Sequence, residues 1–343
     1  MVTRLLLVLF LLATSVSASP KPKNVILLIG DGMGVTHVSA LSLMKKDGFR
    51  IGEMPVTGLA MTPSADRDVT DSAAAASAFA TGASTKYEAV SVDAEGRALP
   101  TMLELAEKRG LATGVVTTSY FFDATPAAFV VHSVHRKRYK EILPAMFKGD
   151  VELIVGSAEE YGDDGVEVSR NAAKDNGYAV ETTLDGLRAS TASKVLALFR
   201  ADSHAGDFDG ARLADLTRAA IDRLSSDPDG FFLMVEHEGI DGGSHDNDGS
   251  IVRRSLLSLD DAVGIALDFA RKNGNTLVVV AGDHETGGLR ISDGRSGRFR
   301  LEWSTTGHTA SAVPVFAFGP GAEAFTGFQQ NFEVGQKLLA TQR

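Results

Sequence analysis

Short apolar runs alternate with amphipathic stretches along most of the chain. Each apolar run is only a few residues long and carries apolar side chains on both faces, which is typical of buried strands. The predicted strands are residues 24–29, 113–118, 231–235, 276–280 and 313–318. The predicted helices are residues 39–46, 73–81, 102–108, 212–224 and 251–271. Buried strands that alternate with helices predict an α/β fold, with a mostly parallel central β-sheet flanked by helices on both faces.

The composition is that of an ordinary globular protein. The chain has 343 residues, of which 44% are hydrophobic and 23% are charged. These values exclude disorder, a coiled coil and collagen-like repeats. Residues 145–211 are polar, rich in Gly and Asp, and weakly periodic, so we expect a peripheral elaboration there rather than a second core. Residues 19–343 are therefore predicted to form a single domain.

Charge and cysteine content exclude further classes of protein. The formal net charge is −10. An acidic surface repels a phosphate backbone, so we expect no nucleic-acid partner. The chain has no cysteine, which excludes disulfides, thiolate metal ligands and cysteine nucleophiles. Any chemistry must use oxygen and nitrogen groups.

Residues 1–18 have the pattern of a secretory signal peptide. Arg4 gives a positively charged start, residues 5–12 an apolar core, and Val16-Ser17-Ala18 a small-residue cleavage site. An apolar core of eight residues is too short to span a bilayer of about 30 Å. We expect cleavage after Ala18, a mature net charge of −11, and a periplasmic or secreted protein without a membrane anchor.

Acidic residues and histidines follow three of the predicted strands. These residues are Asp31 after strand 24–29, Glu236, Asp241 and His245 after strand 231–235, and Asp283 and His284 after strand 276–280. In a parallel sheet the carboxyl ends of the strands meet at one edge, where open α/β sheets bind ligands. Clustered carboxylates raise one another's pKa values unless a cation lies among them. Mixed Asp/His sets without sulfur suit Zn²⁺, and all-oxygen sets suit Mg²⁺, so the pattern predicts a divalent metal centre.

Each of these residues also has a simpler interpretation. Asp31 between glycines could be a turn residue, and Asp283-His284 could belong to a capping loop. Asp241 and His245 have the i,i+4 spacing of an ion pair on a helix face. The metal interpretation is preferred because the simpler one requires three separate coincidences at three strand ends.

The candidate nucleophile is Ser72, which follows Asp71 at the start of an alanine-rich predicted helix. Simple N-capping would explain both residues. A helix N-terminus also favours an anion such as an alkoxide or a phosphate, and metal coordination can activate a serine hydroxyl. On the residues alone, both interpretations stay open.

Six motifs taken together resemble the alkaline phosphatases. They are IGDGMG (29–34), VTDSAAAASAFATG (69–82), DATPAAFVVHSVHR (123–136), VEHEGIDGGSH (235–245), AGDHETGG (281–288) and TGHT (306–309). They occur in the family's order and span about 280 residues. The resemblance implies an alkaline phosphatase-like fold and the hydrolysis of small phosphate monoesters to an alcohol and inorganic phosphate.

The resemblance also implies a role for each matching residue. The implied ligands are Asp241, His245 and His308 for one Zn²⁺, Asp31, Ser72, Asp283 and His284 for a second Zn²⁺, and Asp31, Thr125 and Glu236 for one Mg²⁺. Ser72 would form a phosphoserine intermediate, Arg136 would clamp the phosphate, and Asp71 would orient the Arg136 guanidinium. Thr125 could instead be a helix N-cap before Pro126, and Arg136 part of a solvated basic face. The remaining histidines are expected in packing or surface positions: His37, His132, His135, His204 and His237.

The chain departs from the family in two places. Gly242 follows Asp241, where relatives commonly carry Lys, His or Trp, so Asp123 lacks its usual partner and the Mg²⁺ site is less certain than the zinc sites. Only 23 residues separate His284 from His308, where many relatives insert a crown subdomain used in dimer contacts. The chain is therefore expected to be a monomer or a homodimer.

Other functions are compatible with this fold class. A metal-dependent phosphodiesterase of the same superfamily is the main alternative, although Arg136 and the predicted Mg²⁺ ligands address a terminal phosphate. A sulfatase is disfavoured because Ser72 is followed by four alanines. A non-catalytic exported protein that binds metal or phosphate is a further alternative.

Overall fold

The computed structural model describes residues 21–45, 47–159, 164–200, 207–295 and 298–341. The predicted signal peptide, residues 1–18, and His204 lie outside the described residues. No helix of the described residues is both long enough and apolar enough to cross a membrane.

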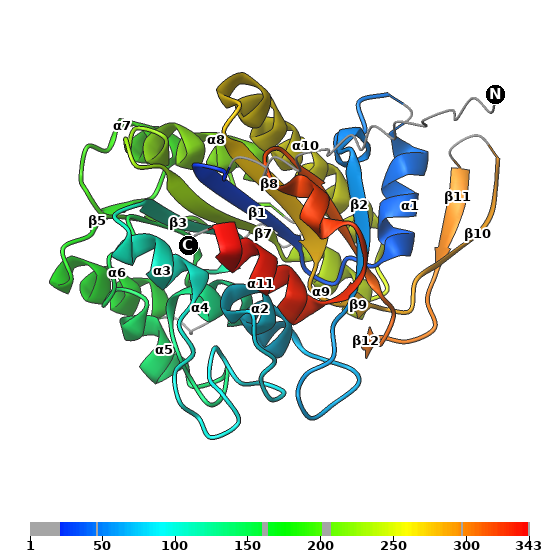
Figure 1. The fold of residues 1–343 in the computed structure, drawn as a ribbon, viewed down its shortest axis with the longest axis horizontal. Coiled ribbons are helices and arrows are strands. Elements are labelled where there is room, and N and C mark those ends of the chain that lie inside the picture. The colour runs from blue at the N-terminus through cyan, green and yellow to red at the C-terminus, as the bar shows by residue number, and fades with distance from the viewer. Residues whose placement is uncertain (1–20, 46, 160–163, 201–206, 296–297, 342–343) are drawn as a thin grey trace, which may run out of the picture.

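A central sheet runs through the molecule, with ten strands among the described residues (Figure 1). Its spatial order is β14-β2-β13-β8-β1-β7-β3-β4-β6-β5. In chain order these strands are β1 (Asn24–Gly30), β2 (Val56–Met61), β3 (Ala112–Tyr120), β4 (Leu153–Ser157), β5 (Ala179–Glu181), β6 (Val195–Leu198), β7 (Phe231–His237), β8 (Thr276–Gly282), β13 (Val313–Phe318) and β14 (Gly327–Gln330). Only β13 is antiparallel to its neighbours in this sheet of described strands, which confirms the mostly parallel sheet.

Helices cover both faces of this sheet. Successive side chains of β1 point to opposite faces, so Val25, Leu27 and Ile29 enter one apolar core while Ile26 and Leu28 enter the other. The first core is closed by α2 (Ser72–Thr81), α3 (Met102–Lys108), α4 (Ala124–Val130), α5 (Tyr139–Ala145), α6 (Gly165–Asp175) and α11 (Asn331–Thr341). The second is closed by α1 (Val35–Met44), α7 (Leu184–Ala189), α8 (Leu213–Leu224), α9 (Gly239–His245) and α10 (Gly249–Asn273). In Figure 1, α8 and α10 lie above the sheet and α2, α4 and α5 below it. This two-layer cover explains why the strands are apolar on both faces.

Two short β-ribbons lie outside the main sheet. One pairs β9 (Glu285–Thr286) with β12 (His308–Thr309), and the other pairs β10 (Arg290–Arg295) with β11 (Arg298–Glu302). The second ribbon lies beside α1, drawn in orange in Figure 1. The β9–β12 ribbon matters for the site, because it places His308 opposite Thr286 and close to the end of β8.

The predicted helices and strands are present, and their ends agree with the structure within four residues. Residues 145–211, where the sequence indicated no strand, contain β4, β5 and β6. These three strands continue the central sheet at one edge beyond β3. They were missed because each has only three to five residues, too few to show a period.

Candidate active site

Three adjacent strands bring the predicted acidic residues to one edge of the sheet. β1 lies between β8 and β7, and Gly30 is in register with Gly282 on one side and His237 on the other. The next residues after Gly30 and Gly282 are Asp31 and Asp283, so both carboxylates leave the sheet at the same level. The sheet register therefore places Asp31 and Asp283 at the same edge of the sheet, as the sequence pattern predicted.

His284 lies at the centre of a first group of ligand atoms. Its Nε2 is 3.3 Å from Asp31 Oδ1, 3.3 Å from Asp283 Oδ2 and 3.2 Å from Ser72 Oγ. Asp31, Asp283 and His284 are buried and can offer one ligand atom each to a common ion. Asp31 Oδ1 and Asp283 Oδ2 are buried without a hydrogen-bond partner among the described residues. Two buried, unsatisfied carboxylate oxygens beside an imidazole fit a Zn²⁺ ion well.

The electrostatics of this group also require a cation. Burial, followed by repulsion from the carboxylate of Asp241, raises the pKa of Asp283 to about 7 despite the hydrogen bond from the backbone N–H of Gly32. Burial likewise raises the pKa of Asp31, with repulsion from Asp283, Asp241 and Glu236 adding to the shift. The pKa of His284 is lowered, first by burial and then by repulsion from His308. The bare chain therefore disfavours the ionised form of both carboxyls, and a divalent ion would favour it.

A second group contains Asp241, His245 and His308. His245 Nε2 lies 3.2 Å from Asp241 Oδ2 and 3.2 Å from His308 Nε2, while His308 Nε2 lies 3.6 Å from Asp241 Oδ1. The other ring nitrogens face backbone carbonyls, His245 Nδ1 at 2.5 Å from Thr306 O and His308 Nδ1 at 2.8 Å from Thr70 O. Both Nε2 atoms therefore face Asp241, the orientation expected of histidine ligands whose other ring nitrogen is held by a hydrogen bond.

Contacts with the apolar core and with His37 hold α9, the helix that carries Asp241 and His245. Ile240 of α9 enters the apolar core, and Ser244 Oγ donates to Ile240 O and lies 3.1 Å from His37 Nε2. His37 Nδ1 in turn accepts a hydrogen bond from the backbone N–H of Gly34. His37 is thus a fully buried packing residue that ties α9 to the loop after β1.

A third set consists of oxygen atoms alone. Thr125 Oγ1 is buried without a hydrogen-bond partner among the described residues. Glu236 accepts a hydrogen bond from Thr117 at 2.5 Å, and burial raises its pKa to about 8 despite that bond. Repulsion from Glu236 is one cause of the raised pKa of Asp31. Carboxylate and hydroxyl oxygens from Asp31, Thr125 and Glu236 fit a hard cation such as Mg²⁺. The alternative that Thr125 caps a helix is wrong, because the N-cap of α4 is Asp123.

Ser72 opens helix α2 and faces the first group. Asp71 is the N-cap of this helix and accepts hydrogen bonds from the backbone N–H groups of Ala73 and Ala74. The capping interpretation is therefore correct for Asp71, and it leaves Ser72 Oγ free to approach His284 Nε2. The positive end of the helix dipole favours an anion at this point.

Arg136 is held between two carboxylates. Its Nη1 donates to Asp71 Oδ2 at 3.2 Å and its Nη2 donates to Asp123 Oδ1 at 3.1 Å. Burial lowers the pKa of Arg136, but attraction to Asp123 and Asp71 outweighs it, so the guanidinium stays charged. Arg136 is not part of a solvated surface, because only 18% of its side chain is exposed.

One cavity of about 600 Å³ is lined by six of the predicted site residues: Asp71, Ser72, Arg136, Asp241, His245 and His308. The other predicted ligands, Asp31, Thr125, Glu236, Asp283 and His284, are not among its lining residues. Sequence reasoning missed further lining residues, which include Arg67, Tyr87, Tyr120, Lys137 and Tyr139. The Arg67 guanidinium lies 3.9 Å above the ring of Tyr87, and the hydroxyls of Tyr120 and Tyr139 are 3.0 Å apart. No motif marked these residues, since Tyr120 ends β3, Tyr139 begins α5, and Arg67, Tyr87 and Lys137 lie in the segments between helices and strands.

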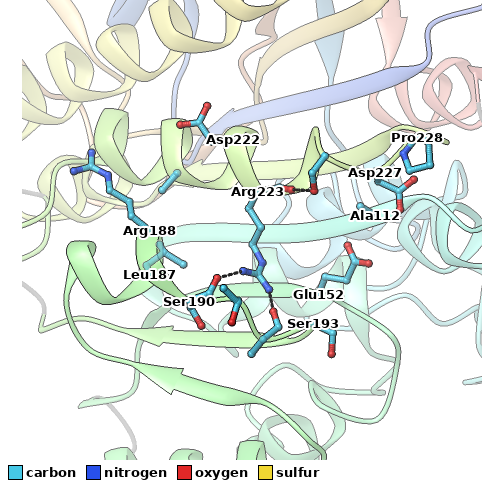
Figure 2. Close-up of a pocket in the computed structure, with 14 residues that line it drawn as sticks. Ala112, Glu152, Leu187, Arg188, Ser190, Ser193, Asp222, Arg223, Asp227 and Pro228 are labelled. Carbon is cyan, nitrogen blue, oxygen red and sulfur yellow. Dashed lines mark hydrogen bonds between the residues drawn. The ribbon is translucent and has the colours of Figure 1, made fainter.

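A larger cavity, of about 790 Å³, lies at the opposite edge of the sheet, where β3 begins (Figure 2). In it Arg223 of α8 donates to the backbone carbonyls of Ser190 and Ala192. Arg223 therefore ties the loop before β6 to α8. None of the predicted site residues lines this cavity, so the chemistry belongs to the smaller one.

Gly242 follows Asp241 of the second group, and the Glu238 side chain packs against it. A Cβ atom at Gly242 would lie 3.1 Å from Glu238 Oε1, so the Glu238 carboxylate packs directly over this glycine. The backbone N–H of Glu238 donates to Thr118 Oγ1 at 3.0 Å, which fixes the start of α9. The acidic side chain of Glu238 thus lies beside Gly242, which has no side chain of its own.

Comparison with known proteins identifies the family. The alkaline phosphatase family model matches residues 22–152 and 157–301. Alkaline phosphatase 4 of Bacillus subtilis is 30% identical over 413 aligned positions, which cover 93% of this chain and 89% of the relative. The chain belongs to the alkaline phosphatase family. The alkaline phosphatase of Escherichia coli is 32% identical, over 94% of this chain and 87% of its own length.

Solved structures of the family agree with this assignment. The alkaline phosphatase of the Antarctic bacterium TAB5 superposes with a TM-score of 0.87 at 34% identity, covering 94% of this chain and 98% of that one. The cold-active alkaline phosphatase of a Shewanella species superposes with a TM-score of 0.86 at 29% identity, covering 93% and 100%. The chain is therefore an alkaline phosphatase-type hydrolase of phosphate monoesters, and a metal-binding protein with candidate metal sites in its structure.

All the predicted site residues gather at this edge of the sheet, while their individual roles stay predictions. The histidines without a predicted role make other contacts: His132 Nε2 is 3.0 Å from Glu104, His135 Nε2 is 3.1 Å from Glu88, and His237 is fully buried at the end of β7. The arrangement brings candidate metal ligands, Ser72 and Arg136 together at one edge of the sheet.

The metal-free protein is expected to lose stability as the pH rises from about 6.5 to about 9. Asp283 and Glu236 act in the lower part of this range, because their pKa values in the folded chain are about 7 and about 8. At about pH 6.5 they still hold protons that carboxyls of the unfolded chain have lost, so rising pH favours unfolding until they too are ionised. His245 acts in the same direction, because its hydrogen bond to Asp241 raises its pKa to about 9. Thermal unfolding with a chelator should show a Tm lower by about 3 °C or more at the higher pH.

The zinc-saturated protein is the control for this measurement. Bound cations displace the protons, so its Tm should not show the same fall. A metal-free Tm that is equal or higher at the higher pH would show that these carboxyls are ionised without a cation.

Proposed function

We propose that the chain hydrolyses phosphate monoesters through a phosphoserine on Ser72, at a site that holds two zinc ions and one magnesium ion. The observation that carries the proposal is the position of Ser72 Oγ. It lies at the N-terminus of α2, 3.2 Å from His284 Nε2, in a group with two unsatisfied carboxylate oxygens. Ser72 and Arg136 also line the same cavity, so one phosphate group can meet both.

The ligand chemistry supports the choice of ions. The two mixed Asp/His groups would hold zinc, Asp241, His245 and His308 in one, and Asp31, Asp283 and His284 in the other. The oxygen set of Asp31, Thr125 and Glu236 would hold magnesium. In the structure of a variant of the TAB5 enzyme, Mg is bound in a site called M3. Bound divalent cations would lower the pKa of hydroxyl groups and stabilise negative charge on oxygen.

Ser72 takes part in both steps of the proposed reaction, as the nucleophile in the first and as the leaving group in the second. Its Oγ forms a bond to phosphorus and loses its proton, while the bond from phosphorus to the alcohol oxygen breaks and the alcohol takes up a proton. A water molecule then forms a bond to phosphorus and the bond to Oγ breaks, which returns the serine hydroxyl and releases inorganic phosphate. The fixed start of α2 holds Oγ in place for its attack and for its departure.

Arg136 binds the phosphate oxygens. Its planar guanidinium presents parallel N–H donors, and contacts with Asp71 and Asp123 fix the plane of the group. Because both carboxylates are themselves helix N-caps, the orientation of Arg136 is set by the starts of α2 and α4. Arg136 is thus oriented before the substrate arrives.

The first test compares p-nitrophenyl phosphate with its bis-ester at about pH 9, with Zn²⁺ and Mg²⁺. We expect kcat/KM for the monoester to be higher by at least about 100-fold, because the site concentrates positive charge for a doubly charged phosphate. A chelator should abolish the activity and added Zn²⁺ should restore it. A preference for the bis-ester would indicate a phosphodiesterase, and metal binding without turnover a binding protein.

Ser72→Ala should remove the phosphoenzyme and lower kcat by at least about 10³-fold. The measurement is covalent labelling with ³²P-phosphate after acid quenching, beside steady-state kinetics. Ser39→Ala, an exposed serine on α1, is the matched control and should keep both label and activity. Full labelling of the Ser72→Ala protein would contradict the proposed intermediate.

Arg136→Lys should lower kcat/KM by about 10–100-fold and raise the inhibition constant for phosphate, because one charge-assisted hydrogen bond is worth about 1.5–3 kcal/mol. Lysine keeps the charge but cannot contact phosphate and both carboxylates in one plane. Arg138→Lys is the control, since Arg138 pairs with Glu141 at the surface. Equal kinetics for the two variants would mean that Arg136 does not contact the phosphate.

A further inference from the structure

Thr286 has no role in the proposed chemistry, yet its hydroxyl lies between the two zinc groups. The residue is fully buried in β9, two positions after His284, and is paired with His308 across the β9–β12 ribbon. Thr286 Oγ1 donates a hydrogen bond to Asp241 Oδ1 and lies 3.2 Å from His284 Nδ1. Asp241 belongs to one zinc group and His284 to the other.

The hydrogen bonds of Thr286 settle which nitrogen of His284 can bind a metal. A hydroxyl has a single proton, and Thr286 gives it to Asp241. Its oxygen must then accept the proton on His284 Nδ1. His284 Nε2 is left without a proton, and this is the atom that faces Asp31, Asp283 and Ser72. The same contact excludes Nδ1 as a ligand of the group around Asp241, although Nδ1 lies only 4.0 Å from Asp241 Oδ1.

The position of the Thr286 hydroxyl is fixed by close packing. Gly32 adopts a φ of +73°, and a Cβ atom there would lie 2.9 Å from both Thr286 Oγ1 and Asp241 Oδ1. The backbone N–H of Thr286 donates to Gly32 O, and the backbone N–H of Gly32 donates to Asp283 Oδ1. The loop at Gly32 therefore packs closely against the Thr286 hydroxyl, and only a glycine fits there.

We propose that Thr286 is a positioning residue that couples the two zinc groups, by orienting Asp241 as a ligand in one and His284 as a ligand in the other. The inference rests on the proposed metal sites. The Thr286 hydroxyl is a hydrogen-bond partner of one ligand from each group, so its loss should change the metal affinity of both sites together. A residue that contacts only one ligand would change the affinity of one site alone. Loss of a partner of this kind typically lowers metal affinity by about 10–100-fold.

The test is a zinc titration of the metal-stripped protein against a chromophoric chelator, which needs no turnover. Thr286→Val keeps the shape of the side chain and removes the hydroxyl, and Thr286→Ser keeps the hydroxyl. Thr217→Val is the matched control, because Thr217 is fully buried in α8 and its hydroxyl has no hydrogen-bond partner among the described residues. Thr286→Ala removes the same hydroxyl and takes the place of the valine variant if that protein does not fold.

Thr286→Val is expected to weaken zinc binding by about 10–100-fold at both sites, Thr286→Ser by no more than about threefold, and Thr217→Val not at all. In protein substituted with ¹¹³Cd, both metal resonances should shift in Thr286→Val and return in Thr286→Ser. Unchanged zinc affinities in Thr286→Val would overturn the proposal, as would weakening at one site alone. If the wild-type protein binds two zinc ions but hydrolyses no monoester, the proposed function fails and the Thr286 inference stands.

Discussion

The burial of several carboxylates at one sheet edge is the constraint on which this site depends. Asp31, Asp283 and Glu236 are fully or almost fully buried at one sheet edge, and burial raises the pKa of each. Such a cluster is costly to ionise in the bare chain and becomes favourable when cations enter. The fold tolerates this cost because the acids are attached to β1, β7 and β8, whose apolar side chains fill both cores. The apolar side chains of the strands stabilise the fold, so the strand ends can carry buried carboxylates that oppose folding.

The position of the site could be predicted because it depends on backbone topology. An acidic residue directly after a buried strand must lie at the carboxyl edge, and the register of Gly30 with Gly282 shows this for Asp31 and Asp283. Side-chain partners could not be predicted in the same way. Asp123 contacts Arg136 only because it caps α4, and Thr286 reaches Asp241 only because β9 and β12 pair. Those contacts depend on distances between segments that no local pattern encodes.

The short strands at the far edge of the sheet also show what a local sequence pattern cannot predict. β4, β5 and β6 extend the sheet beyond β3, but each is too short for its period to be visible in the sequence. They add no residue to the cavity that contains Ser72 and Arg136. The predicted signal peptide, residues 1–18, stays a prediction. The motifs that contain Ser72, Arg136 and the predicted metal ligands were therefore more informative about the functional site than the composition was.

Recognition of phosphate is an unusual task for a chain with a net charge of −10. Three cationic side chains line the cavity, Arg67, Arg136 and Lys137, and so do three acidic ones, Asp71, Glu88 and Asp241. Arg136 also pairs with Asp71 and with Asp123, so the protein groups around the phosphate position carry no net positive charge. In the proposed site, the metal ions and the N-terminus of α2 would supply the attraction that a doubly charged phosphate needs. On the proposed function, phosphate affinity should therefore depend on metal loading.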